Sequence, residues 1–236
     1  MSPPSVRIAS YNLQKCVGLD LRRRPGRSLK VINAIKADVM VLQEADKRLP
    51  PRPAALPHGQ AQAEGWQILP FGPQGKHLGG SLGWHGNAML TRDHVTVHET
   101  SHLELPGLEP RGAIRADLET SIGPLRVIGV HLGLVRRYRL LQLAAIRRAM
   151  EHWAQMPTLI VGDFNEWRSM AALEATAHGL SCLHTPPSFP AARPVARLDR
   201  MLITEQLHAH DMGVWAQRPA HVASDHLPVW ADLCLS

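Results

Sequence analysis

Polar side chains of the kinds that catalytic sites use stand where apolar runs of the sequence end. Asn12 follows residues 8–11, Glu44 follows residues 39–43 and His131 follows residues 127–130. Five further residues of this kind end, precede or interrupt later apolar runs: Asp163, Asn165, Asp199, Asp225 and His226. Strand ends hold side chains rigidly at a cleft, where carboxylates and imidazoles can move protons. Each residue alone could be an ordinary turn residue, but the whole set predicts one functional cleft.

Seven short motifs contain these residues and follow one another through nearly the whole chain. They are Tyr11-Asn12, Gln43-Glu44, Gly86-Asn87-Ala88, Val130-His131-Leu132, Gly162-Asp163-Phe164-Asn165, Leu198-Asp199-Arg200 and Ser224-Asp225-His226. In type and order they resemble the endonuclease/exonuclease/phosphatase superfamily, from residue 11 to about residue 228. The fifth and seventh motifs are specific when they occur together in this order. The likeness is greatest to small bacterial members of the superfamily.

The resemblance implies an α+β fold of four layers, in which two mostly antiparallel sheets lie face to face with helices outside. It also implies an active site at one end of this sandwich and divalent-metal-dependent hydrolysis of phosphoesters. By the same resemblance Glu44 is the principal metal carboxylate, and Asn12 and Asp225 complete or support the metal site. Such hard oxygen ligands suit Mg²⁺ or Mn²⁺ and not zinc.

The resemblance assigns roles in catalysis to five more residues. Asp163 aligns and deprotonates the attacking water, and Asn165 holds a phosphate oxygen. His226 contacts the scissile phosphate and is oriented by Asp199 through its other ring nitrogen. His131 contacts the phosphate or the leaving group from the other side. Imidazoles and amides around a metal ion would stabilise the charge that develops on the phosphate during in-line attack.

Two further positions match phosphate-binding positions of the family, namely Arg111 and Asn87. The chain also departs from the family pattern. Gln14 stands where several relatives carry an acidic residue, which weakens a second metal site, and no Tyr-x-Glu element of the deoxyribonuclease kind precedes Asn87. His131 and the pair Asp199-Arg200 are similar to the deoxyribonuclease and sphingomyelinase branches.

Two other functions fit parts of the sequence. Residues 79–83 fit the G-x-S-x-G elbow of serine hydrolases, and Ser81, Asp199 and His226 run in the chain order of that fold. The elbow needs a strand before it and a helix after it, whereas here a glycine-rich loop leads into a strand. We therefore reject a serine hydrolase. A non-catalytic scaffold that binds a polyanion or a protein is the other alternative, and the intact metal and phosphate set argues against it.

The composition fits one globular domain over residues 1–236, with 44% hydrophobic and 19% charged residues. The net charge of +6 suits a polyanionic partner or simply reflects an arginine-rich composition. No apolar run approaches the ~20 residues that span a bilayer, and residues 1–7 contain no apolar region typical of a signal peptide. Cys16, Cys182 and Cys234 lie far apart in the sequence. We therefore expect a reducing, cytoplasmic environment and no obligate protein partner.

Short apolar runs between turn residues predict a domain in which strands dominate. Strands are expected over residues 6–13, 39–43, 66–71, 88–91, 95–103, 113–118, 125–132, 158–162, 198–203, 209–215 and 229–233. Helices are expected over residues 29–36 with Ser28 as the cap, over residues 136–153, and between Ser169 and Gly179. The helix over residues 136–153 carries one apolar stripe, and its arginines are expected to face solvent. Residues 48–60 are expected to form a surface loop.

From the resemblance we expect a phosphodiester hydrolase with nucleic acid, DNA or RNA, favoured as the substrate. The positive net charge and the likeness to deoxyribonucleases support this choice. A phospholipid, as for a sphingomyelinase, and a phosphomonoester are the alternatives. Arg22, Arg23, Arg24 and Arg27 could fringe the cleft and hold a polyanion, or they could form an ordinary solvated loop.

Overall fold

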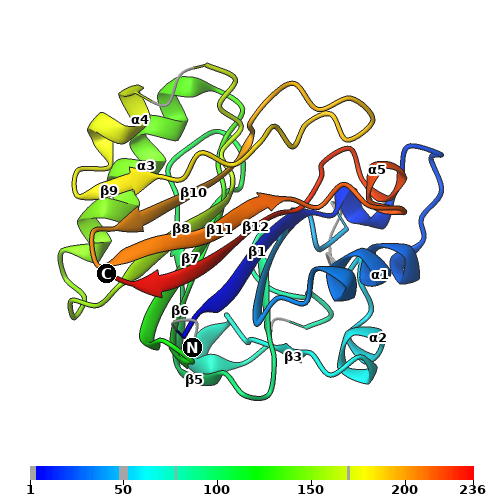
Figure 1. Ribbon diagram of the computed structural model, residues 1–236, viewed down its shortest axis with the longest axis horizontal. Helices are drawn as coiled ribbons and strands as arrows, with labels where there is room; N and C mark the ends of the chain where they lie inside the picture. The colour runs from blue at the N-terminus through cyan, green and yellow to red at the C-terminus, as the bar shows by residue number, and fades with distance from the viewer. Residues whose placement is uncertain (1–3, 48–52, 78, 169–170) are drawn as a thin grey trace.

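Two six-stranded sheets lie face to face at the centre of the molecule in a computed structural model (Figure 1). The structure describes residues 4–47, 53–77, 79–168 and 171–236. The first sheet, in the order β11-β12-β1-β2-β4-β3, consists of β1 Val6–Asn12, β2 Val39–Gln43, β3 Gln67–Ile68, β4 Ala88–Thr91, β11 Leu207–Val214 and β12 Val229–Leu235. The second sheet, in the order β5-β6-β7-β8-β10-β9, consists of β5 Thr96–Glu104, β6 Gly112–Thr120, β7 Gly123–His131, β8 Thr158–Asp163, β9 Leu180–Cys182 and β10 Asp199–Thr204.

Each sheet has one parallel pair of strands at its centre, and a helix connects the two strands of each pair. The helix α1 (Pro25–Ile35) connects β1 to β2, and α3 (Arg136–Met150) connects β7 to β8. The other strand pairs are antiparallel. In register, Asn12 lies beside Gln43, and His131 lies beside Asp163. The carboxyl ends of both parallel pairs therefore present polar side chains of the predicted cleft.

Three apolar clusters divide the molecule into four layers. One cluster fills the space between the sheets, a second lies between the first sheet and α1, and a third lies between the second sheet and α3. Neighbouring residues of a strand pack into different apolar clusters, because their side chains point to opposite faces of the sheet. Ile8 faces the opposite sheet, and Ala9 faces α1. The predicted α+β sandwich with helices outside is thereby confirmed.

The helix boundaries differ from the sequence prediction at several points. The helix α1 begins at Pro25, and Ser28 is buried inside it, so the prediction of Ser28 as a cap is wrong. Proline already has the backbone angle of a first helical residue, which explains the earlier start. The helix α2 (His58–Ala63) begins inside the predicted loop, of which residues 48–52 lie outside the described residues. Ser169 also lies outside them, and α4 (Ala171–Thr176) occupies the stretch predicted to follow it.

The predicted apolar stripe of α3 is present, with Leu143 and Ile146 fully buried in the cluster under the second sheet. Arg137 and Arg148 face solvent as expected. Arg139 does not, because it is only 4% exposed and donates from Nη2 to Glu166 Oε2 at 3.1 Å. The sequence prediction treated all the arginines of this helix alike, and a buried carboxylate partner makes Arg139 the exception.

Several short elements were not predicted from the sequence. These are β9, the helix α5 (Ala220–Ala223) and the 3-10 turns η1 (Gln14–Cys16) and η2 (Pro73–Gly75). Elements of three or four residues are too short to show an apolar period. Throughout the described ranges, no helix is both long enough and apolar enough to cross a membrane.

Candidate active site

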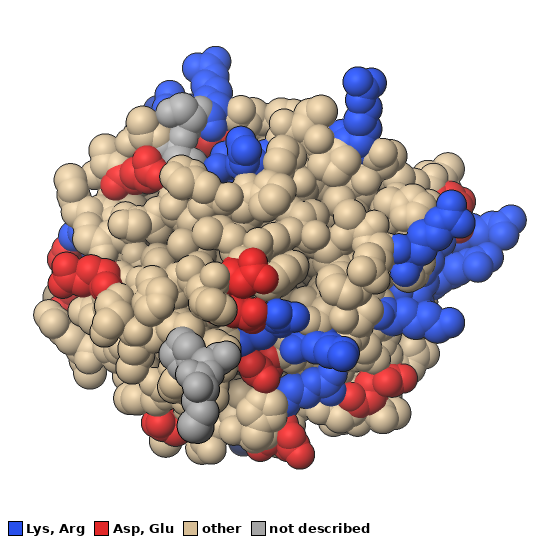
Figure 2. Space-filling model, viewed as in Figure 1, with Lys and Arg blue, Asp and Glu red and all other residues tan. Residues whose placement is uncertain are grey.

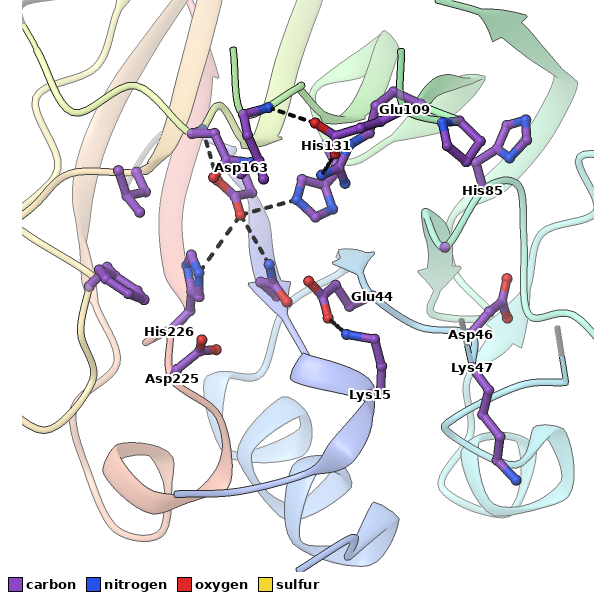
Figure 3. Close-up of a pocket in the computed structure, with 18 of the residues that line it drawn as sticks. Lys15, Glu44, Asp46, Lys47, His85, Glu109, His131, Asp163, Asp225 and His226 are labelled. Carbon is purple, nitrogen blue, oxygen red and sulfur yellow. Dashed lines mark hydrogen bonds and ion pairs between the residues drawn. The ribbon is translucent and has the colours of Figure 1, made fainter. Parts of the chain in front are cut away.

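A cavity of about 520 Å³ opens at the end of the sandwich where β1, β2, β7 and β8 finish (Figure 3). Eight of the ten residues predicted for the site line it: Asn12, Glu44, Arg111, His131, Asp163, Asn165, Asp225 and His226. The structure thus brings together residues from both sheets that lie as far apart in the chain as Asn12 and His226. The described lining residues do not include the other two, Asp199 and Asn87.

The Asp163 carboxylate lies between His131 and His226 in this cavity (Figure 3). Its Oδ2 accepts a hydrogen bond from Asn12 Nδ2 at 3.0 Å and lies 3.4 Å from His131 Nε2 and 3.7 Å from His226 Nε2. Its Oδ1 accepts the backbone N–H of Asn165 at 2.9 Å. Burial, together with the nearby negative charge of Asp199, raises the pKa of Asp163 above its ordinary value. A carboxylate of raised pKa beside an open cavity is suited to accept a proton from water.

His226 is held from behind by a fully buried carboxylate. Its Nδ1–H donates to Asp199 Oδ2 at 2.9 Å, and Ser188 Oγ donates to the same oxygen at 2.5 Å. Burial alone lowers the pKa of His226, but the carboxylates of Asp199 and Asp163 outweigh burial and raise this pKa to about 10. His226 is therefore a cation at neutral pH, and its Nε2–H points toward Asp163 and the cavity.

His131 has the opposite character on the other side of Asp163. Burial lowers the pKa of His131 well below its ordinary value, and the positive charges of Arg111 and His226 act in the same direction. Arg111 is fixed at the wall by its Nη2, which donates to Glu109 Oε2 at 2.7 Å. A neutral imidazole and an imidazolium thus face one carboxylate, an arrangement that can move a proton and stabilise negative charge on a substrate.

Asn12, Glu44 and Asp225 supply side-chain oxygen atoms to the cavity, and these are the donors that a hard divalent cation prefers. Lys15 Nζ forms an ion pair with Glu44 Oε2 (Figure 3). Lys15 and Glu44 both have left-handed backbones, with φ of 57° and 50°. Such strained backbone is concentrated at functional sites, and in this structure the Lys15 ammonium neutralises the Glu44 carboxylate.

Gln14, the departure from the family pattern, holds this part of the site together. Its backbone N–H donates to Asn12 Oδ1 at 3.0 Å, and its side-chain Oε1 accepts the backbone N–H of Asp225 at 3.2 Å. The hydroxyl of Ser224 donates to the Asn12 carbonyl at 2.7 Å. An acidic residue at position 14 could accept the same hydrogen bond from Asp225, but it would add a negative charge to the site. Gln14 positions the Asp225 backbone without adding that charge.

A second set of possible cation ligands overlaps the catalytic groups. Asp163, Asp199 and His226 each offer an atom, and these atoms lie within 4.8 Å of one another. His226 Nδ1 already bonds Asp199, however, so a metal ion there would have to compete with the imidazolium for both carboxylates. In the set of Asn12, Glu44 and Asp225, the Lys15 ammonium pairs with Glu44, and Asn12 Oδ1 and Asp225 Oδ1 accept hydrogen bonds from the Gln14 backbone and the Ser224 hydroxyl. A metal ion there would displace one partly exposed ion pair and leave the imidazolium of His226 in place.

Two residues singled out in the sequence lie away from the chemistry. Asn87 is buried, and its Nδ2 donates to the Gly112 carbonyl at 2.9 Å, so its place is a structural support behind the cavity. Ser81 donates to Asp46 Oδ2 at 2.5 Å and does not line the cavity with His226. The arrangement of a serine hydrolase is therefore absent from the described part of the chain.

The sequence analysis missed several residues that line the cavity, among them Lys15, Glu109 and Phe189. Phe189 packs against the His226 ring at 4.8 Å between centroids. Lys15 and Glu109 lie within three residues of predicted site residues, and this proximity was the available signal. Nothing in the sequence around Phe189 marks it, because a long connection folds it back onto the site.

The comparisons with known proteins identify the family of this chain. A sequence model of the Endonuclease/Exonuclease/phosphatase family matches residues 9–226, and the chain belongs to this family, whose members are hydrolases that act on phosphoester bonds. The uncharacterized protein YbhP of Escherichia coli (strain K12) is 30% identical over 164 residues, which are 65% of this chain and 64% of that protein. The aligned part thus covers less than two thirds of that relative.

Solved structures share the fold. A mannosyl-6-phosphatase of Bacteroides thetaiotaomicron superposes with a TM-score of 0.76 at 18% identity, covering 97% of this chain and 99% of that chain. The TDP2 protein of D. rerio, complexed with a single-strand DNA product, superposes with a TM-score of 0.73 at 16% identity, covering 97% and 98%. At these identities the likeness shows the fold alone.

We predict that Asp199→Asn lowers the pKa of His226 by more than about one pH unit, because the buried counter-charge that favours the imidazolium is lost while burial still disfavours it. NMR titration of the His226 imidazole in metal-free protein measures this pKa. Asp211→Asn, which neutralises an exposed carboxylate on β11, is the matched control. An unchanged His226 pKa in Asp199→Asn would show that Asp199 does not set the charge of this imidazole.

Proposed function

We propose that this protein is a divalent-metal-dependent phosphodiester hydrolase and that nucleic acid is its favoured substrate. The observation that carries the proposal is the buried Asp163 carboxylate, which lies between a neutral His131 and a cationic His226. Beside it the cavity holds a set of carboxylate and amide oxygens. Family membership supports phosphoester hydrolysis in general. We propose in addition that the reaction needs a divalent metal ion, that the bond cleaved is a phosphodiester and that the substrate is a nucleic acid.

Asn12, Glu44 and Asp225 are the residues that we propose to hold the metal ion, Mg²⁺ or Mn²⁺. Their donors are all oxygen, and the Lys15 ammonium at Glu44 supports a preference for positive charge at this place. When bound, the ion would act as a Lewis acid that neutralises charge on the phosphate. Lys15 would then be displaced from Glu44 and left free to face the substrate.

The protein's own groups divide the remaining work. Asp163 orients a water molecule and takes its proton, for which its raised pKa is suited. His226 donates from Nε2 to a phosphate oxygen and brings positive charge to it. Asn165 fixes the Asp163 side chain through its backbone N–H, while its Nδ2 donates to the Leu132 carbonyl at 2.9 Å. In this structure the Asn165 amide thus braces the loop, and a direct contact with phosphate through it would require that bond to break.

His131 and Arg111 lie on the side of the cavity opposite to His226. A neutral His131 can hydrogen-bond the leaving-group oxygen, and Arg111 adds a fixed positive charge. The two sides together provide the polarity that in-line displacement at phosphorus needs. Asp199 acts through His226 and is a positioning residue.

A polynucleotide is favoured as the substrate because the cavity has an exposed aromatic side chain at its rim. Trp167 is 63% exposed and lines the cavity, where it could stack on a base. The net charge of +6 acts in the same direction. The structural likeness to a protein complexed with single-strand DNA product adds support.

A phosphomonoesterase is the second candidate, and the specific observation in its favour is the superposition on a mannosyl-6-phosphatase with a TM-score of 0.76.

One observation favours a phospholipid substrate. Basic side chains gather on the side of the molecule where the segment between η1 and α1 lies (Figure 2). There Leu21 is 86% exposed beside Arg22, Arg23 and Arg24, a mixture that suits anionic membranes. These arginines are absent from the described lining of the cavity, so fringing it remains a prediction.

The cysteines support placing the protein in the cytoplasm. Cys16, Cys182 and Cys234 are all free thiols, and Cys16 and Cys234 are buried. Free buried thiols are typical of proteins that work in a reducing compartment.

We predict that Glu44→Gln and Lys15→Met change metal affinity in opposite directions. Glu44→Gln removes a ligand charge and should weaken Mn²⁺ binding by about tenfold or more. Lys15→Met removes the competing ammonium and should tighten binding by about twofold to fivefold, as expected for breaking a partly exposed ion pair. Isothermal titration calorimetry with Mn²⁺ measures both, with Glu205→Gln as a surface control. Equal affinities in all four proteins would rule out the metal site proposed at Glu44.

We predict that Asp163→Asn lowers turnover by about 10²-fold to 10⁴-fold while substrate binding persists, because an amide cannot take the proton of the attacking water. The measurement is hydrolysis of a panel of single- and double-stranded DNA, RNA, anionic phospholipid vesicles and soluble phosphomonoesters, with Mg²⁺ and with chelator. Asp211→Asn is the control. Turnover that survives the chelator would refute the metal dependence, and preference for vesicles or monoesters would refute the choice of nucleic acid.

A further inference from the structure

A second cavity, of about 570 Å³, lies beside the catalytic cavity, and Trp167 lines both. Three arginines line its wall, namely Arg168, Arg197 and Arg200, and we call it the arginine cavity. Among its described lining residues Glu174 is the one carboxylate. The cavity therefore carries an excess of positive charge, and its position next to the catalytic groups makes the same substrate the natural ligand.

The Arg200 guanidinium is the strongest sign that this cavity binds an anion. Arg200 is only 8% exposed, and its Nε is buried without a hydrogen-bond partner in the described part of the chain. No ion pair of Arg168, Arg197 or Arg200 is found among the described residues. Burial lowers the pKa of Arg200, and the opposing effects of Cys182 and Glu166 do not outweigh burial, since Glu166 is already paired with Arg139. The desolvation of the guanidinium is therefore only partly offset. An anion bound in the cavity would supply a counter-charge.

The strand β10 explains how the two cavities come to be neighbours. Successive residues of a strand point to opposite faces, so β10 directs Asp199 to His226 in the catalytic site and Arg200 to the arginine cavity. Arg197, just before this strand, is held by its Nε, which donates to the Thr185 carbonyl at 2.9 Å. The positive groups are thus mounted on the same rigid element as the group that orients His226.

Aromatic rings connect the two cavities. The Trp167 ring lies 5.5 Å from the Phe189 ring between centroids, in an edge-to-face contact, and Phe189 contacts His226 at 4.8 Å. A polynucleotide alternates phosphates with flat bases, and exposed aromatic side chains stack on such bases. The order of groups along the surface, from imidazolium to aromatic rings to arginines, matches the order phosphate, base, phosphate.

We propose that the arginine cavity binds a second, non-scissile phosphate of the substrate, and that Trp167 stacks on the base between the two phosphates. This inference rests on the proposed function and makes it more specific, because the substrate would be a single-stranded polynucleotide. A compact monoester with one phosphate would not reach the cavity, and a membrane lipid would not place a base on Trp167.

The test is equilibrium binding of a fluorescein-labelled single-stranded oligothymidylate, measured by anisotropy in chelator over a range of salt concentrations. The double variant Arg168→Gln/Arg197→Gln removes two exposed guanidinium groups and should weaken binding roughly tenfold. The slope of log affinity against log salt should fall by about 0.7, the value for one phosphate contact in a single strand. The control Arg137→Gln/Arg148→Gln removes the same charge from the exposed face of α3 and should leave the slope unchanged.

Arg200→Met should weaken binding as well, and circular dichroism shows whether this buried replacement still folds. If it does not fold, the double variant decides. An equal loss of oligonucleotide affinity in the two double variants would overturn the proposal, because the loss would then come from the lower net charge and not from the arginine cavity. No loss in either, or no binding of the oligonucleotide by the wild-type protein, would overturn it too.

A second assay separates this inference from the proposed function. Thymidylyl-thymidine carries one phosphodiester and no second phosphate, so its hydrolysis with Mg²⁺ tests the catalytic site alone. Hydrolysis by the wild-type protein together with equal binding in both double variants would refute only the arginine cavity. Failure of every diester to react would refute the proposed function. Even then, a loss of oligonucleotide binding in Arg168→Gln/Arg197→Gln and not in the control would still support a phosphate site in the arginine cavity.

Discussion

The burial of the Asp163 carboxylate is the constraint on which the rest of this structure depends. Asp163 is 1% exposed, and a buried charge without partners would cost several kcal/mol. Its partners come from four segments: Asn12 at the end of β1, His131 at the end of β7, Asn165 after β8 and His226 before β12. The carboxyl ends of the parallel strand pairs of both sheets therefore lie at the same end of the sandwich, and the apolar cluster between the sheets holds them there.

The same constraint explains how charge is distributed around the cavity. Two carboxylates, Asp163 and Asp199, share one cationic imidazole, and the positive charges of Arg111 and Lys15 lie against Glu109 and Glu44 at the periphery. Acidic groups thus outnumber the cations at the floor of the cavity.

The strands and most of the site could be predicted from the sequence, because short apolar runs that end in Asn, Glu, His or Asp are visible without any tertiary context. Predictions failed where tertiary partners decide. Arg139 reads as a solvated helix residue and is instead buried against Glu166. Asn87 belongs to a matching motif and yet bonds the Gly112 carbonyl behind the cavity. The pairing of Lys15 with Glu44, and of Phe189 with His226, depends on turns and on a long connection whose path no local pattern encodes.

We propose that Glu44 holds the metal ion and that Asp163 stays free as the base, although Asp163, Asp199 and His226 could also surround a cation. The most direct measurement is the anomalous difference map of a crystal of this protein soaked in Mn²⁺. The account predicts a peak within coordination distance of oxygens from Asn12, Glu44 and Asp225, with the His226–Asp199 hydrogen bond intact. A peak bonded to Asp163, Asp199 and His226 would contradict it, because the proposed base and the imidazolium would then be metal ligands.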